Sequence, residues 1–531
     1  MGPNDPISHS GDGQVNSGDD SSTEPTPDTK SGLGQSPTPT ESEEQPKVAD
    51  ITPLAEDKPS TPDVVVPPAG SKGNPKKKWL LIAVVVLIVL IGLGAFWYFV
   101  VHKSNQTTAS AKNNKNITTL VYAVHWTENS QLYGIKNSKG QVVTWGLKQY
   151  LDEYTKLHPD VRFVIEQIAY ANYPTQLPVL AASGAGPDIY QIYSTWAPSL
   201  VQAKLLATPP ASVVKDVQSN YISTSGVTVD GQIWGYPTEV DNYALLYNKT
   251  LFKQAGIVDA QGNPVAPKTW ADVVADATKL TKKNAQGQIT QYGFAFLENN
   301  SWESSDPFLS LLFSNGGSYL SSDYKTCEVN SPAGVAALND ELQLFQNGST
   351  DVNGSFYNFG NGSVGMVISP PWTKSTFAAN FGSSFSTTVG VAPLPYITKP
   401  ATLQYSWFMG VMNDSQHKTA AWNFLQWFDT DVQANGTTRY GDLLTDNIGS
   451  IPDRKVDFYA AANKPVLGDF FTGVFLNQMS DSVAEPNVMQ ADTIKNDLMN
   501  EIQDAWAGQV TAQQALDAAC SQINPILQEY Y

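Results

Sequence analysis

Aromatic side chains follow three short apolar runs of this sequence, at the points where the runs end. His125 and Trp126 follow residues 120–124, Tyr170 follows residues 161–168, and Tyr193 and Trp196 follow residues 188–192. An aromatic ring can cover the apolar C–H face of a sugar, while nearby carboxylates and amides bind its hydroxyl groups. The pattern therefore indicates binding chemistry for a polyhydroxylated solute, with Glu128 as a carboxylate close to the first run.

Motifs for covalent or metal-dependent chemistry are missing from the chain. It contains no GxSxG, HExxH or GxxxxGK segment, and its last three histidines, His125, His158 and His417, are widely spaced. The balance of 32 Lys+Arg against 50 Asp+Glu argues against nucleic-acid binding, which requires a basic surface. We therefore expect a non-enzymatic protein without cofactor or metal. A glycosidase, which needs only two carboxylates, is the enzymatic alternative.

The apolar runs alternate with amphipathic segments that predict helices. Leu147, Tyr150, Leu151, Tyr154 and Leu157 repeat at helical spacing, with Thr144 as the expected cap, and a second helix is expected at 173–182. The order strand–helix–strand–helix–strand predicts an α/β fold with a parallel sheet. Ligands of such sheets bind beyond the carboxyl ends of the strands, where the aromatic residues lie. Further strands are expected at 243–247, 364–368 and 389–392, and further helices after Thr269, at 420–428, at 494–506 and from 512 onward.

Six segments in order resemble the extracellular solute-binding proteins of ABC importers, the group that includes maltose- and oligosaccharide-binding proteins. The resemblance covers residues 117–531. Its segments are GPDIY at 186–190 with Trp196 and Leu205-Leu206, WGYPTEVD at 234–241 with LYNK at 246–249, PKTW at 267–270, FGNGSVGM at 359–366 with Pro371-Trp372, GVAPLP at 390–395, and GSIPDR at 449–454.

The resemblance implies a two-lobe periplasmic-binding-protein-like fold with the solute between the lobes. Lobe one would hold about 117–239 and 389–435, and lobe two about 240–388 and 436–531. Crossovers near 237–241, 389–395 and 436–448 would form a hinge that closes around the ligand.

The resemblance also adds candidate binding residues. Trp372 matches a family tryptophan that stacks on the ligand, Asp241 matches an acidic position of the cleft, and Trp407 lies where relatives bring a further aromatic ring. The complete set of expected ligand-binding residues is Trp126, Glu128, Tyr170, Tyr193, Trp196, Tyr236, Asp241, Trp302, Trp372 and Trp407. The alternative interpretation of each is a ring or charge that only stabilises the fold.

The chain before the expected binding domain has two parts of opposite character. Residues 1–75 lack aromatic residues and are rich in Pro, Ser, Thr and acidic residues, which predicts a disordered cytoplasmic tail. Residues 76–102 begin with three lysines and continue without charge from Trp79 to Val101, which predicts one transmembrane helix. A polar linker at 103–116 would follow, and cleavage after Ala111 is the alternative to an uncleaved anchor.

These expectations describe a single-pass protein of the cell membrane with an extracellular or periplasmic binding domain. Its partners would be a small solute, with a carbohydrate favoured, and the permease subunits of an ABC importer. A peptide or polyol as the solute, or a sensor role, are the alternatives within the same scaffold. Cys327 and Cys520 are too few for a disulfide framework, and the sequence leaves open whether they form one bridge or remain two buried thiols.

Overall fold

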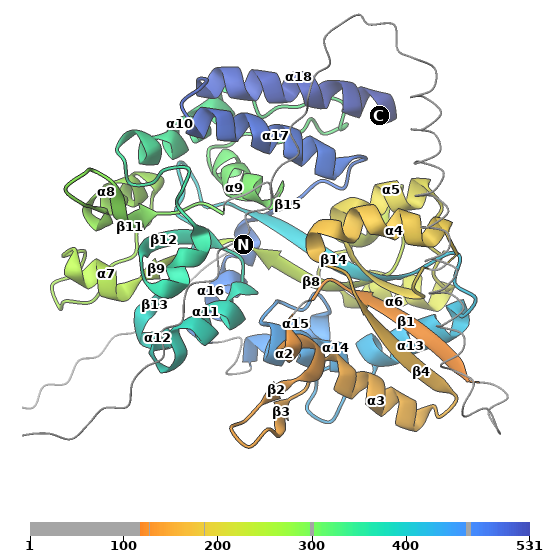
Figure 1. Ribbon diagram of the computed structural model, residues 1–531. Helices are drawn as coiled ribbons and strands as arrows, with labels where there is room; N and C mark the ends of the chain where they lie inside the picture. The colour runs from red at the N-terminus through yellow and green to blue at the C-terminus, as the bar shows by residue number, and fades with distance from the viewer. Residues whose placement is uncertain (1–116, 127, 185, 298–301, 464–468) are drawn as a thin grey trace, which may run out of the picture. The chain divides into compact units, whose positions relative to one another are not determined.

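The computed structural model describes residues 117–126, 128–184, 186–297, 302–463 and 469–531 (Figure 1). The expected tail, transmembrane helix and linker at 1–116 lie outside these residues. Within the described ranges, no helix has the length and apolar character needed to cross a membrane. The described chain forms two α/β lobes, each built around its own sheet.

The first sheet has the order β15-β14-β5-β1-β4, and β8 also pairs with β14. Strand β1 (Thr118–Val124) is parallel to both β4 (Val161–Gln167) and β5 (Ile189–Tyr193), which confirms the predicted parallel α/β unit. Strand β14 (Thr402–Val411) is antiparallel to β5 and to β8 (Tyr236–Asn242), and β15 (Ser482–Ala484) runs parallel to β14.

Helices cover this sheet because their apolar faces match the 3.6-residue period. Helix α3 (Leu147–Leu157) buries Leu147, Tyr150, Leu151 and Tyr154, but it begins after Gly146, so the predicted cap at Thr144 is wrong. Thr144 instead ends the short strand β3 (Val142–Thr144), which pairs with β2 (Ile135–Lys136). The helices of this lobe include α2 (Asn129–Tyr133), α3 (Leu147–Leu157), α4 (Tyr173–Ala182), α5 (Ala197–Gln202), α6 (Ala211–Asn220) and α13 (Lys418–Thr430).

The second sheet has the order β10-β11-β12-β9-β13. Its strands are β9 (Ala244–Asn248), β10 (Lys282–Lys283), β11 (Ile289–Phe294), β12 (Val364–Ser369) and β13 (Val389–Ala392). Its helices include α7 (Lys249–Gln254), α8 (Trp270–Leu280), α9 (Asp306–Ser314), α10 (Pro332–Gln346) and α11 (Thr373–Phe381). The Thr269 hydroxyl accepts a hydrogen bond from the Asp272 amide, which confirms the predicted cap of α8.

The path between the lobes differs from the expected division at three places. Strand β15 pairs with β14 in the first sheet, although residues 436–531 were expected in lobe two. Strand β13 pairs with β9 in the second sheet, so the chain returns to lobe one only at β14 and not at residue 389. Residues 439–463 form α14 (Arg439–Asp442), a π-helical segment (Leu443–Ile448) and α15 (Lys455–Asn463). This segment belongs with lobe one, because Asn447 donates hydrogen bonds to the backbone oxygens of Ser130 and Trp145.

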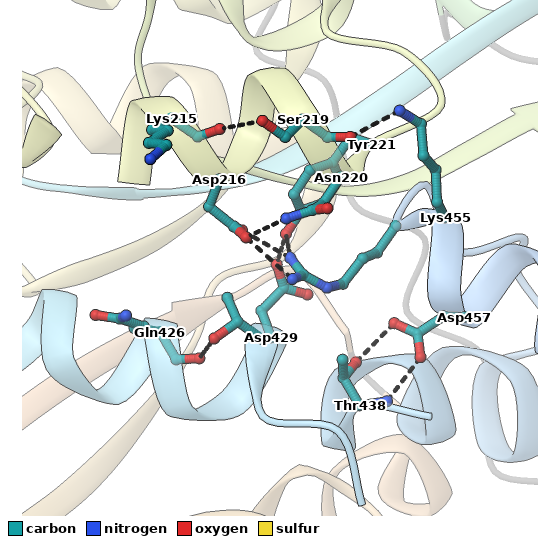
Figure 2. Close-up of polar contacts among 12 residues, drawn as sticks. Lys215, Asp216, Ser219, Asn220, Tyr221, Gln426, Asp429, Thr438, Lys455 and Asp457 are labelled. Atoms are coloured by element: carbon teal, nitrogen blue, oxygen red, sulfur yellow. Dashed lines mark hydrogen bonds and ion pairs between the residues drawn. The ribbon is translucent and has the colours of Figure 1, made fainter. Parts of the chain in front are cut away.

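A buried ionic network fixes that segment to lobe one (Figure 2). Arg454 pairs with Asp216 of α6 at 2.8 Å. The Tyr221 hydroxyl donates to Asp429 of α13. Thr438 donates from both its amide and its hydroxyl to Asp457, each at 2.7 Å. Because Asp429 is buried, its pKa is raised well above the usual range despite the nearby guanidinium of Arg454. The network joins α6, α13 and α15 into one body.

The C-terminal helices complete lobe two. Helix α17 (Ala491–Trp506) and helix α18 (Ala512–Tyr530) pack on each other beside α10 (Figure 1). A disulfide joins Cys327, in the loop after α9, to Cys520 of α18 across 193 residues. Of the two alternatives that the sequence left open for these cysteines, the structure has the bridge.

Candidate functional site

A layer of aromatic rings lies at the carboxyl ends of β1 and β5, as the strand order predicted. The register of β14 against β5 places Trp407 opposite Tyr193, and their ring centroids are 5.1 Å apart. Trp196, which follows β5, lies 5.5 Å from Trp407, and His125, which follows β1, stacks on Trp407 at 4.1 Å. Tyr170 contacts the His125 ring at 5.9 Å. The ends of β1 and β5 follow from the local sequence, whereas Trp407 lies beside them because β14 pairs with β5.

His125 contributes an apolar face rather than a charge. Burial lowers the pKa of its imidazole to about 3, although the nearby Gln191 side chain opposes the shift. The ring is therefore neutral at physiological pH and acts as a flat surface beneath Trp407.

Three buried charged side chains lie against the aromatic layer. Lys495 of α17 contacts both Asp306, the first residue of α9, and Glu485, which follows β15, at 2.6 Å each. The side chains are 1%, 0% and 2% exposed, respectively. Burial raises the pKa of Asp306, whereas Lys495 opposes that rise. Burial lowers the pKa of Lys495, but the two carboxylates outweigh it and the net shift is upward.

Hydrogen bonds connect the charged group to the rings and join the two lobes. The Tyr193 hydroxyl of lobe one donates to Glu485 at 2.7 Å, and the Tyr243 hydroxyl donates to Asp306 at 2.6 Å. The Trp196 indole donates to Asp492 of α17 at 3.0 Å. Burial raises the pKa of Asp492 to about 6, against the effect of the indole hydrogen bond. The result is an aromatic layer of lobe one facing Asp306, Asp492 and Lys495 of lobe two, with Glu485, which follows the lobe-one strand β15, paired to Lys495. This combination is able to bind hydroxyl groups and sugar faces.

A second contact between the lobes involves Glu128, one of the expected binding residues, and α11, the helix that follows Trp372. The Thr376 hydroxyl of α11 donates to Glu128 at 3.4 Å, and Trp372, partly buried, lies immediately before α11. Glu128 is exposed after β1 in lobe one. The loop after β1 and the start of α11 therefore approach each other from opposite lobes.

The remaining expected residues lie elsewhere or in other roles. Trp126 is 4% exposed, and its ring lies 6.1 Å from His125. Asp241 accepts hydrogen bonds from the Ile451 amide and the Tyr405 hydroxyl, so protein groups occupy both of its oxygens, and burial raises its pKa. Tyr236 packs against Tyr221 and Trp422 inside lobe one, away from the aromatic layer. Of Trp302, only the backbone at the start of the η4 turn (Trp302–Ser305) is described.

Sequence reasoning missed Lys495, Asp306, Glu485 and Asp492. One signal was available: Lys495 lies three and four residues before Leu498 and Met499 on the buried face of α17. A lysine on an apolar helix face requires a buried partner. The identity of that partner depends on the fold, because Asp306 is far away in the sequence.

A large cavity lies apart from the aromatic layer. It has a volume of about 990 Å³, and none of the expected binding residues whose side chains the structure describes lines it. Glu485 is its one member in common with the charged group. Over the same described residues, no group of three metal-ligating side chains is present.

Two α/β lobes with an aromatic and charged layer between them define a two-lobe binding protein. The family of bacterial extracellular solute-binding proteins matches residues 141–434, more than half of the chain. The protein belongs to this family, whose members and structural neighbours bind solutes and are not enzymes.

Known proteins similar to this chain cover most of its length. The galactooligosaccharide-binding protein of Bacillus subtilis is 24% identical over 416 residues, 72% of this chain and 89% of that protein. The sn-glycerol-3-phosphate-binding periplasmic protein UgpB of Pectobacterium atrosepticum is 26% identical over 422 residues, 71% and 87% of the two chains. The cyclic alpha-maltosyl-1,6-maltose binding protein of Arthrobacter globiformis has the same fold, with a TM-score of 0.60, 24% identity, and coverage of 78% and 100%.

Proposed function

We propose that this protein binds an oligosaccharide between its lobes and delivers it to the permease of an ABC importer. The observation that carries the proposal is the aromatic layer of Tyr193, Trp196 and Trp407 facing Asp306 and Lys495 of lobe two, with Glu485 of lobe one paired to Lys495. Saccharide-binding relatives support it. In this proposal the rings stack on sugar faces, and the carboxylates and the ammonium exchange their mutual contacts for hydroxyl groups.

The charge of the site favours a neutral sugar over a phosphorylated polyol. Lys495 already contacts two carboxylates, and Asp492 adds a third carboxylate close by. An anionic phosphate would therefore meet a net negative environment, which disfavours binding. This argument ranks the sugar above sn-glycerol-3-phosphate, the solute named for a relative of similar identity.

The proposal includes a membrane location. Residues 76–102 would anchor the protein through one helix, with the binding domain outside the cytoplasm and residues 1–75 inside. The uncharged run from Trp79 to Val101 supports this topology. Protease added to intact cells should digest the binding domain and spare a tag placed at the N-terminus.

A ligand screen tests the proposed solute class. The purified full chain is followed by thermal shift and tryptophan fluorescence with maltotriose, maltotetraose, a galactooligosaccharide, sn-glycerol-3-phosphate and a tripeptide. A ligand at 100 times its Kd stabilises a protein by about 2.7 kcal/mol, a readily measured rise in Tm. We expect a response to one or more saccharides.

Two variants and a control test the proposed site. Trp407→Ala and Trp372→Ala should each weaken saccharide binding at least tenfold, because each removes a ring surface from the interface. Trp145→Ala, at a tryptophan that is 43% exposed, should leave binding unchanged. A response to the tripeptide or to sn-glycerol-3-phosphate alone would refute the saccharide, and unchanged binding in both site variants would refute the site.

A further inference from the structure

The 990 Å³ cavity lies between the lobes but outside the aromatic layer. Its walls come from α5 and the turn between β6 (Thr228–Val229) and β7 (Gln232–Ile233) in lobe one, and from the loop after α9 and the end of α18 in lobe two. Residues 483–487, around β15, form another wall. The Glu485 carboxylate of this segment accepts hydrogen bonds from Tyr193 and Lys495. The segment therefore lies between the cavity and the aromatic layer.

Aromatic rings line the lobe-two side of this cavity. They are Phe313, Tyr319, Tyr324, Tyr530 and Tyr531, and no tryptophan is among the described residues of its wall. The Tyr324 and Tyr531 rings meet edge to face at 5.8 Å. The Tyr531 hydroxyl accepts a hydrogen bond from the Met489 amide at 2.9 Å, which holds the end of the chain against the wall.

Tyr324 occupies a backbone conformation that a tyrosine adopts with difficulty. Its φ is +58°, in the left-handed region where glycine and asparagine are favoured. A bulky residue at such a position indicates that its side chain serves a purpose, since strained residues concentrate at ligand-binding sites. At Tyr324 the side chain contributes a ring to the cavity wall.

The polar groups of the wall suit a neutral hydroxylated ligand. The Tyr319 hydroxyl and the Asn487 side-chain oxygen are buried and have no hydrogen-bond partner in the described part of the chain. Buried polar atoms of this kind favour a ligand or water molecule that supplies the missing hydrogen bonds. The exposed charges of the wall, Lys399 and Asp230, are of opposite sign and balance each other. Rings, unpaired polar atoms and balanced charge together match a saccharide rather than an ion.

We propose that this cavity is a second saccharide-binding site, separate from the one between the aromatic layer and the charged group. A volume of about 990 Å³ accommodates an oligosaccharide. Because both lobes supply its walls, a bound saccharide would contact both of them.

Calorimetric titration of the full chain with maltotetraose tests the second site. The wild type should bind two molecules, one that changes tryptophan fluorescence and one that gives heat without such a change, since the cavity wall has no described tryptophan. Tyr324→Gly should weaken the fluorescence-silent event at least tenfold. This variant removes the ring and also the unfavourable φ, so the protein should remain folded.

Lys204→Gly is the matched control. Lys204 also has a φ of +58° but does not line the cavity, so its replacement changes the backbone preference alone. Both binding events should persist in this variant. Tyr319→Phe, which keeps the ring and removes the hydroxyl, should weaken only the silent event.

The outcomes separate this proposal from the proposed function. A single event that Trp407→Ala abolishes and Tyr324→Gly leaves intact would overturn the second site and keep the first. A single event with the opposite response would support the second site and refute the first. No binding of maltotetraose or of any other saccharide in the screen would overturn both.

Discussion

Replacement of Lys495 by methionine should destabilise the protein strongly near neutral pH. The substitution keeps the length and the apolar stem of the side chain but removes the charge that contacts Asp306 and Glu485 at 2.6 Å. Both carboxylates are almost fully buried, so solvent cannot replace the lost partner. Removal of one partner from such a group typically costs about 3–5 kcal/mol.

The pH dependence gives a second, independent magnitude. Without Lys495, a carboxyl must take up a proton to remain buried. For a group with an ordinary pKa of about 4, this costs about 4 kcal/mol at pH 7 and about 1.4 kcal/mol less for each unit of lower pH. Because the folded pKa is raised, the variant keeps its stability at low pH and loses it as the pH rises. We therefore expect a loss of about 4 kcal/mol at pH 7 and about 1 kcal/mol at pH 5.

Urea unfolding followed by tryptophan fluorescence measures this loss. Lys279→Met is the matched control, because Lys279 is 55% exposed and pairs with Asp276 at 2.9 Å. It should lose less than about 1 kcal/mol. Adding Asp306→Asn and Glu485→Gln to Lys495→Met should recover most of the stability. An equal loss in the Lys495 and Lys279 variants would refute the reasoning, since it would mean that the charged group is hydrated in solution.

Three further predictions follow from the same contacts. Burial raises the pKa of Asp492 to about 6, so this group favours the folded state below pH 4 and loses that contribution as the pH rises through 6. The Asp492→Asn variant should therefore be more stable than the wild type by up to about 3 kcal/mol at pH 7.5, and equally stable at pH 3.5. An equal difference in stability at both pH values would contradict the raised pKa of Asp492. Replacement of both Cys327 and Cys520 by alanine should lower the free energy of unfolding by about 4–5 kcal/mol, because the bridge closes a loop across 193 residues, and an unchanged urea midpoint under oxidising conditions would show that the bridge does not form. Small-angle scattering should show a smaller radius of gyration with a saturating saccharide than without it, and an unchanged radius would count against hinge closure.

Local patterns predicted β1, β4, β5, α3, α4 and α13 of the first lobe, because their signals lie within single segments. The ends of β1, α4 and β5 were predicted to within two residues. The Thr269 cap of α8 could be predicted because a cap depends only on residues within one helical turn. Sheet membership depends on distant partners instead. The sequence VGVA of β13 fits either sheet, and only its pairing with β9 assigns it to lobe two.

The same distinction applies to the candidate site. The rings after β1 and β5 could be named because strand ends gather at one edge of a parallel sheet. Tyr236 was grouped with them, but its side chain points into the core of lobe one, toward Trp422. Lys495 and Asp306 lie 189 positions apart, and neither has a local pattern that names the other. Their pairing is a property of the fold, not of either segment.

The division of lobe two along the chain has a consequence for its synthesis. Helices α9 and α10 are made well before α17 and α18, the helices that cover α10. Residues 347–490 must be made before these helices, which takes roughly 7–30 s at usual rates of translation. During this interval, apolar side chains of α10 such as Leu338 and Leu342 lack their final cover. The nascent chain should therefore be most prone to aggregation, and most in need of a chaperone, before α18 emerges.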